Sequence, residues 1–232
     1  MSIYVIGDLH LSKDPRIDKP MDIFGESWVN HDTRLEEEWN RIVTDEDTVL
    51  IVGDISWGLK LEEAMMDLEW IDQLPGKKVI IKGNHDLWWS GINKMNSLFD
   101  TITFLQNTAY VDGKLAVCGT RGWNCPGSEN FQESDTKIYN REVLRLEMSL
   151  KDAVSKGAET IVGILHYPPT NDKKQPSDFT RLFEEYGVKK AFYGHLHSED
   201  AKRNSRSLNL NGVSYKLVSL DAVDCVPQLC QL

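Results

Sequence analysis

Short apolar runs recur along the chain, and each one ends at a glycine or a polar residue. The runs cover residues 3–6, 49–52, 79–81, 161–165 and 191–193. Continuous apolar runs of this length, bounded by turn-forming residues, are typical of strands that are buried on both faces. We therefore predict a buried strand at each of these places.

Between these runs, apolar residues recur at helical spacing. Helices are predicted over residues 34–43, 61–74 and about 136–156. Gly157 and Gly187 are expected to end the helices that precede them. Strands that alternate with helices predict an α/β fold with a largely parallel sheet and helices outside it.

The later part of the chain has a different pattern. Strand-like stretches at residues 103–105, 115–118 and 215–220 follow one another, with the turn pairs Asp112-Gly113 and Asn211-Gly212 between them. Such pairs favour hairpins, and hence a mixed sheet or two packed sheets. Because no repeat or linker interrupts residues 1–232, we predict a single domain. Its longest irregular segment, residues 11–33, is a possible active-site loop.

The composition of the 232 residues is that of a globular protein, with 41% hydrophobic and 27% charged side chains. The 26 Lys and Arg residues against 36 Asp and Glu residues give a formal charge of −10. This charge repels phosphate backbones, so general nucleic-acid binding is not expected.

The cysteines Cys118, Cys125, Cys225 and Cys230 form no CxxC pair, which favours free thiols in a reducing compartment. No apolar run approaches the roughly 18 residues that span a bilayer, and no signal peptide is apparent. We therefore expect a cytoplasmic protein that does not associate with membranes.

Polar side chains with metal-binding chemistry follow the predicted buried strands. In open α/β sheets, ligands bind beyond the carboxyl ends of the strands, so these residues should converge in space. The residues are Asp8, His10, Asp54, Asn84, His166, His195 and His197.

Seven imidazole, carboxylate and amide ligands are too many for one transition metal. Two ions that share one carboxylate require seven residues, and Asp54 is a natural bridge. Imidazole together with carboxylate suits Mn, Fe or Zn better than Mg or Ca. Two divalent ions about 3.5 to 4 Å apart are an arrangement that hydrolyses phosphate esters.

These blocks, in order, are Asp8-Leu9-His10, Gly53-Asp54, Gly83-Asn84-His85-Asp86, the lone His166, and Gly194-His195-Leu196-His197. With them the chain resembles the calcineurin-like metallophosphoesterase family. The resemblance implies a four-layer α/β/β/α sandwich with two mixed sheets and the metal site at the carboxyl ends of the strands. It also implies one ion on Asp8, His10, Asp54 and His197, and a second on Asp54, Asn84, His166 and His195.

The expected activity is metal-dependent hydrolysis of a phosphate ester through attack by a metal-bridging hydroxide. His85, next to Asn84, is the candidate catalytic residue because its imidazolium can protonate the departing alkoxide. The family resemblance implies the same role. Asp86 either orients a neighbour or caps the helix that follows.

One departure from the family pattern bears on the substrate. Many members continue the second block as GD-x-x-D-R or GD-x-x-N-R, whereas this chain has Trp57 and Gly58 at those two places. A dianionic monoester gains more from an additional Arg, so we expect a phosphodiester, a nucleotide or another phosphorylated small molecule. The alternatives are a phosphomonoesterase acting on a protein or small molecule, and an inactive metal-binding interaction module.

Two further residues are possible substrate contacts. Arg121 follows a strand-like stretch and either supplies a guanidinium for phosphate or lies in a surface turn. His31, placed by the sequence in the loop of residues 11–33, either is solvated or approaches the metals as part of a lid.

Overall fold

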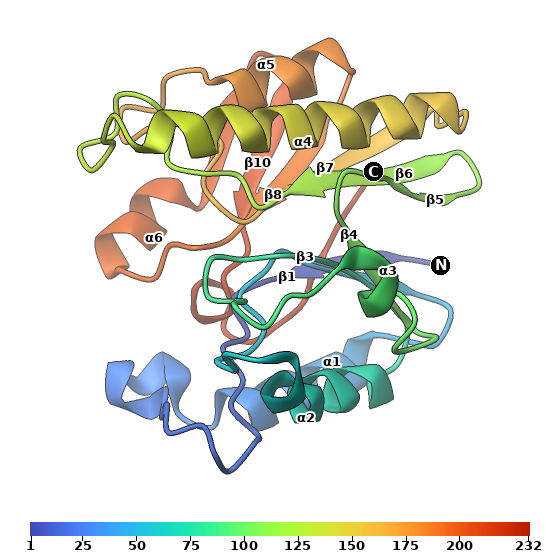
Figure 1. Cartoon of the computed structure of the whole chain (residues 1–232), viewed down its shortest axis with the longest axis vertical. Coiled ribbons are helices and arrows are strands. Elements are labelled where there is room, and N and C mark those ends of the chain that lie inside the picture. The colour runs from blue at the N-terminus through green and yellow to red at the C-terminus, as the bar shows by residue number, and fades with distance from the viewer.

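The structure, a computed structural model, describes residues 1–232 apart from the side chain of residue 201. Two β-sheets pack face to face, and helices cover both outer faces (Figure 1). The expected four-layer α/β/β/α arrangement with two mixed sheets is confirmed.

The first sheet contains three of the predicted buried strands and has the order β11-β1-β2-β3-β4. Strands β1 to β4 are parallel, and β11 joins the edge of the sheet antiparallel to β1. The predicted strand positions are correct, with ends that differ by one or two residues. The strands are β1 (Ile3–Ile6), β2 (Thr48–Ile51), β3 (Lys77–Ile81), β4 (Ile102–Leu105) and β11 (Gln228–Leu229).

The second sheet has the order β5-β6-β7-β8-β10-β9, with a parallel centre and an antiparallel strand at each edge. The predicted hairpins around Asp112-Gly113 and Asn211-Gly212 are present as β5–β6 and β9–β10. The strands are β5 (Tyr110–Asp112), β6 (Leu115–Thr120), β7 (Thr160–Leu165), β8 (Lys190–Tyr193), β9 (Ser207–Leu210) and β10 (Val213–Leu217).

One strand does not lie where the hairpin pattern placed it. The stretch at residues 103–105 belongs to β4, which pairs in parallel with β3 in the first sheet rather than with β6. The sequence showed consecutive strands here, but the chain leaves one sheet after Leu105 and enters the other at Tyr110.

The main helices cover the outer faces of the sheets. Helices α1 (His31–Ile42) and α2 (Leu61–Gln73) lie on the first sheet, and α4 (Asp135–Ser155) and α5 (Asp178–Glu185) lie on the second (Figure 1). The shorter elements are α3 (Ile92–Met95), α6 (Glu199–Ser205) and the 3₁₀ turns η1 (Asp22–Phe24), η2 (Glu26–Trp28) and η3 (Leu220–Ala222).

Buried apolar side chains form clusters that match the layers. Leu50 and Val79 of the first sheet meet Val162 and Ile164 of the second in the layer between the sheets. Trp39 belongs to a second cluster under α1 and α2. A third cluster, with Leu146 and Phe183, lies under α4 and α5. Each sheet is thus buried on both faces, as the continuous apolar runs predict.

The segment of residues 11–33 is more ordered than its composition suggests. It contains the 3₁₀ turns η1 and η2, and helix α1 begins at His31 rather than at residue 34. The expectation that His31 lies in a loop is therefore wrong. The polar first turn of α1 hides the helix start, because its apolar face begins only at Leu35.

Two further expectations can be compared with the described residues. Cys118, Cys125, Cys225 and Cys230 are buried free thiols. In the part of the chain that the structure describes, none of the helices combines the length and apolar character needed to cross a membrane.

Candidate metal centre

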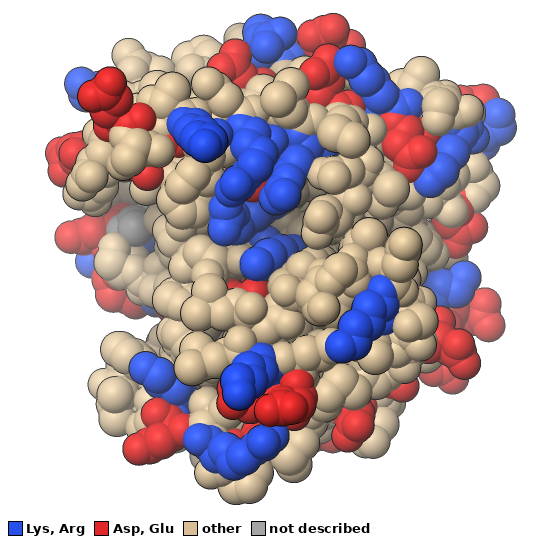
Figure 2. Space-filling model, viewed as in Figure 1, with Lys and Arg blue, Asp and Glu red and all other residues tan. Residues whose placement is uncertain are grey.

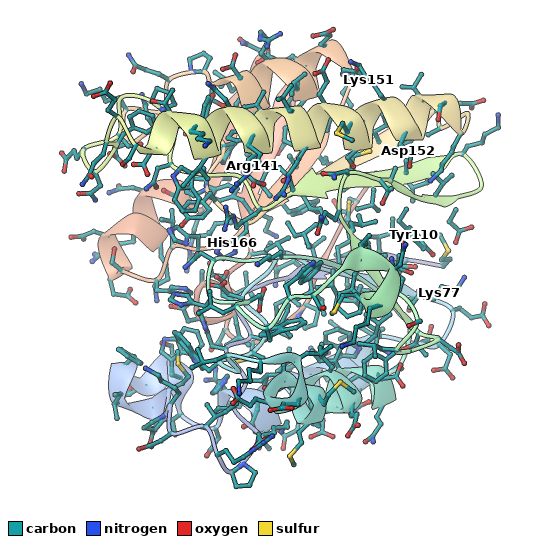
Figure 3. All side chains as sticks on the ribbon, viewed as in Figure 1. Lys77, Tyr110, Arg141, Lys151, Asp152 and His166 are labelled. Atoms are coloured by element: carbon teal, nitrogen blue, oxygen red, sulfur yellow. The ribbon has the colours of Figure 1, made fainter. Side chains whose placement is uncertain are left out.

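The predicted ligands converge at one edge of the sandwich, where strands of both sheets end. Asp8 and His10 follow β1, Asp54 follows β2 and Asn84 follows β3 in the first sheet. His166, His195 and His197 follow β7 and β8 in the second sheet, and Figure 3 shows His166 at the level between the two sheets.

Candidate ligand atoms lie close enough to share a metal ion. One atom each from Asp8, His10 and His197 lies within 4.8 Å of the others, and the same holds for Asp8, Asp54 and His166. Asp54 Oδ2 is 3.8 Å from His10 Nε2 and 3.4 Å from His166 Nε2. Asp54 is thus near a histidine of each group, and Asp8 belongs to both groups.

The backbone is unusual at these positions. Asp8, His10, Asp54 and His195 have positive φ angles of 56°, 46°, 53° and 74°. Non-glycine residues adopt this conformation rarely, and such strain concentrates at functional sites. The site thus has the backbone signature of a functional centre.

The glycines beside the ligands permit a very close approach of the strand ends. A Cβ on Gly83 would lie 2.1 Å from Asp54 Oδ1, and one on Gly194 would lie 2.2 Å from Asp8 Oδ2. Any other residue at either place would push a candidate ligand out of position.

His166 and His195 both direct a ring nitrogen at the amide oxygen of Asn84. His166 Nδ1–H donates to the carbonyl of Val52 at 3.0 Å, so its Nε2 carries a lone pair. That Nε2 lies 2.6 Å from Asn84 Oδ1, and His195 Nδ1 lies 2.9 Å from the same amide oxygen. Acceptor atoms held this close fit a shared cation better than they fit one another.

Burial sets the protonation of the site. Desolvation lowers the pKa values of His10 and His166, and it lowers that of His195 to about 3. These imidazoles are therefore neutral at pH 7, the state that binds metal. Burial and the neighbouring charge of Asp8 raise the pKa of Asp54. Paired carboxylates buried in this way are stabilised by cations.

His197 is held by an acidic residue that the sequence analysis did not identify. Its Nδ1 lies 2.9 Å from Asp221 Oδ1 in η3, and Asp221 also forms an ion pair with Lys202 at 3.3 Å. Burial alone would lower the pKa of His197, but its hydrogen bonds to Asp221 and Asp8 raise it to about 10. A carboxylate behind a ligating His fixes the direction of the ring. Asp221 follows β10, so the strand-end rule extended to this strand would have found it.

We predict that Asp221→Asn weakens metal binding about 10- to 100-fold, because the ring of His197 loses its charged partner. Calorimetric titration with Mn²⁺ measures this change. Asp224→Asn is the matched control, because Asp224 lies nearby, is exposed and pairs instead with Arg34. Equal Mn²⁺ affinity of the Asp221→Asn variant and wild type would show that Asp221 does not support His197 as a metal ligand.

Asp86 orients its neighbours, which decides between the two alternatives for this residue. Its buried carboxylate accepts hydrogen bonds from the backbone N–H groups of Asp54 at 2.9 Å, Ile55 at 2.8 Å and Gly83 at 2.7 Å. It thereby ties the loop after β2 to the loop after β3. Asp86 thus holds the backbone of Asp54 and the backbone of Gly83, the residue before Asn84.

His85 lies at the exposed side of the centre. Its backbone N–H donates to Asp54 Oδ1 at 2.8 Å, and its ring centroid is 5.6 Å from that of His10. Trp57 stands at the second acidic position of the GD-x-x-D-R pattern. Its ring centroid lies 4.5 Å from that of His85, and it stacks on His10 with centroids 4.8 Å apart. The ring of His85 is thus positioned by aromatic packing.

The loop of residues 11–33 contacts the centre through Trp28, whose ring lies 5.6 Å from His10 and 5.5 Å from His197. His31 packs on the same Trp28 ring at 5.4 Å and borders a cavity of about 260 Å³. The sequence analysis gave Trp28 no role, since nothing in its spacing relates it to the histidines.

The contacts of the Arg121 side chain are with residues other than the candidate metal ligands. Its guanidinium lies over the ring of Trp123 at 4.6 Å and forms an ion pair with the buried Glu142 at 3.5 Å. Its carbonyl, however, accepts hydrogen bonds from the N–H groups of His166 and Tyr167. Arg121 therefore supports the loop of a candidate metal ligand with its backbone, and it also lines a neighbouring cavity.

Two facing mixed sheets with a buried Asp and His cluster at their strand ends define an α/β protein with a candidate dinuclear metal centre. The model of the calcineurin-like phosphoesterase family matches residues 1–199, and the chain belongs to this family.

Two curated relatives match over shorter segments. The gene 66 protein of Mycobacterium phage L5 is 45% identical over 56 residues, which are 24% of this chain and 27% of that protein. The gene 66 protein of Mycobacterium phage D29 is 37% identical over 86 residues, or 37% of this chain and 40% of that protein. The chain thus matches well under half the length of either relative.

Solved structures agree in fold. A protein of unknown function from Aquifex aeolicus matches with a TM-score of 0.52 and 15% identity, covering 98% of this chain and 95% of its own. A phosphopantetheinyl hydrolase from Mycobacterium tuberculosis matches with a TM-score of 0.54 and 14% identity, covering 94% and 88%. At these identities the likeness shows the fold alone.

Proposed function

We propose that the chain is a metal-dependent phosphohydrolase whose preferred substrates are phosphodiesters or nucleotides. The observation that carries the proposal is the position of Asp54. Its Oδ2 lies 3.8 Å from His10 and 3.4 Å from His166, so this carboxylate is near one histidine of each proposed ion site. This is the arrangement expected of a bridging ligand between two ions.

The donor set fits two divalent ions of Mn, Fe or Zn, because it combines neutral imidazoles with carboxylates and one amide oxygen. We assign Asp8, His10, Asp54 and His197 to one ion and Asp54, Asn84, His166 and His195 to the other. When bound, the ions would supply a water of lowered pKa and neutralise phosphate oxygens.

His85 completes the proposed chemistry. Hydrolysis breaks the bond between phosphorus and the leaving-group oxygen, which must gain a proton as its negative charge develops. His85 follows Asn84 and presents its ring at the exposed side of the centre, where a departing group has room to leave. The proton moves from the imidazolium of His85 to the departing oxygen. Burial lowers the pKa of this ring, so its protonated, donating form is favoured at acidic pH.

A cavity next to His195 supports a substrate larger than a simple phosphate. It has a volume of about 350 Å³, within the usual range of small-molecule pockets. Its lining includes several amides such as Asn130 and Asn171, and the opposite charges of Asp172 and Lys174 offset each other. Such a cavity suits a neutral polar group esterified to the phosphate.

The test compares bis(p-nitrophenyl) phosphate with p-nitrophenyl phosphate as substrates of the Mn²⁺-loaded chain. We expect faster cleavage of the diester, and loss of that cleavage after chelation of the metal. Cleavage of the monoester alone would favour a phosphomonoesterase. Failure on both substrates with two bound ions per chain would favour a metal-binding interaction module.

A further inference from the structure

A second cavity, of about 200 Å³, opens where β3, β4 and β6 end. Its cationic lining residues come from three parts of the fold. Lys82 follows β3, Arg121 follows β6, and Arg141 and Arg145 share one face of α4. Figure 2 shows Lys and Arg side chains gathered on this face, beside and below α4.

The charges in this cavity do not balance. Among the described residues that line it, Glu142 supplies the single carboxylate against four cationic side chains. Glu142 is fully buried and lies 3.0 Å from Arg145, 3.5 Å from Arg121 and 3.6 Å from Arg141. Its other oxygen accepts a hydrogen bond from Thr120 at 2.6 Å. One carboxylate therefore anchors three guanidinium groups and leaves an excess of positive charge.

Two cationic donors in the cavity have unmet capacity. Arg121 Nε is buried, and the described residues provide it with no hydrogen-bond partner. Lys82 also lines the cavity, and the hydrogen bonds and ion pairs of the described residues give its Nζ no partner. In a protein with a formal charge of −10, such a local excess of donors is a specific feature for binding an anion.

The basic cavity is joined to the metal centre through the backbone. Lys82 lies two residues before Asn84, and the carbonyl of Arg121 accepts the hydrogen bond from the N–H of His166 at 3.1 Å. The cavity beside His195 lies toward the β8 end of the same centre. Both cavities therefore border loops that carry candidate metal ligands.

We propose that the basic cavity binds a second anionic group, of the phosphate class, carried by the substrate. This inference rests on the proposed function and narrows it to organic phosphates that bear a further phosphate near the one that is cleaved. Guanidinium groups pair with phosphate through two parallel hydrogen bonds, and the volume accommodates a phosphate or diphosphate.

The test uses two chromogenic diesters that differ by one phosphate. They are thymidine 5′-(p-nitrophenyl phosphate) and its 3′-phosphorylated derivative. We expect kcat/KM of wild type to be about tenfold or more higher for the phosphorylated ester. The double variant Arg141→Gln/Arg145→Gln should lose this preference yet keep its rate on the other ester. Lys151→Gln, on the same helix but paired with Glu147, should behave as wild type (Figure 3).

An equal kcat/KM for the two esters in wild type, or a preference that survives in the double variant, would overturn the inference. Calorimetric titration of the metal-loaded chain with inorganic phosphate separates this inference from the proposed function. If neither ester is cleaved but the double variant loses a phosphate site, the cavity binds phosphate and the proposed function fails. If phosphate binds there without competing against the phosphorylated ester, the site takes a free anion and the substrate assignment fails.

Discussion

Asp54→Asn is expected to lower the hydrolysis rate by about 10³-fold or more and to reduce the metal content of the chain. The amide of Asn lacks the negative charge that a bridging carboxylate provides, which removes several kcal/mol of charge stabilisation. Each 1.36 kcal/mol of lost stabilisation lowers the rate about tenfold. Rates on bis(p-nitrophenyl) phosphate and elemental analysis of the purified variant measure both effects. Asp100→Asn, a change of an exposed carboxylate, serves as the control.

A thermal measurement separates this loss from misfolding. Burial and the charge of Asp8 raise the pKa of Asp54, so its carboxylate destabilises the metal-free folded chain at neutral pH. The metal-free Asp54→Asn variant should therefore unfold at a temperature no lower than that of metal-free wild type. A markedly lower unfolding temperature would assign the lost activity to damaged folding.

His85→Asn is expected to lower kcat about 10²- to 10⁴-fold on a substrate with an alkoxide leaving group. A p-nitrophenolate needs little protonation as it departs, so the decrease should be much smaller on p-nitrophenyl esters. His85 contributes only its backbone N–H to Asp54, so metal content should match wild type. Rates on a methyl ester and a p-nitrophenyl ester of the same phosphate measure the contrast.

An equal decrease on both leaving groups would contradict proton donation by His85 and would indicate a positioning role. Loss of bound metal in His85→Asn would show that the change disturbs the loop of Asn84. Either result would require another donor for the leaving group.

The convergence of the candidate metal ligands could be predicted because the residues that follow parallel strands lie at one edge of the sheet. The apolar runs located β1, β2, β3, β7 and β8, and the polar residues after them could then be assembled in space. The prediction needed only the order of the strands along the chain and the chemistry of the residues that follow them.

Contacts between distant segments could not be predicted in this way. Asp221 reaches His197 only because η3 folds back beside the end of β8, and Trp28 reaches His10 only through the path of the loop. The basic cavity is a similar case. Arg141 and Arg145 resemble an ordinary solvated helix face until Lys82, from the other sheet, is placed opposite them.

The start of α1 illustrates a second limit. Helical periodicity identifies a helix by the apolar residues of its buried face. A polar first turn, such as the one that contains His31, lacks this signal and is predicted as a loop. The sequence pattern therefore places His31, a candidate substrate contact, in a loop, whereas His31 lies in the first turn of α1.

The most direct test of a shared two-metal centre is a titration of the metal-free chain with Mn²⁺, with bound metal and hydrolysis of bis(p-nitrophenyl) phosphate measured in the same samples. The structure predicts two bound ions per chain and a rate that rises with the second. Full activity with a single bound ion, or activity in the absence of metal, would contradict the assignment of Asp54 as the ligand shared by two ions.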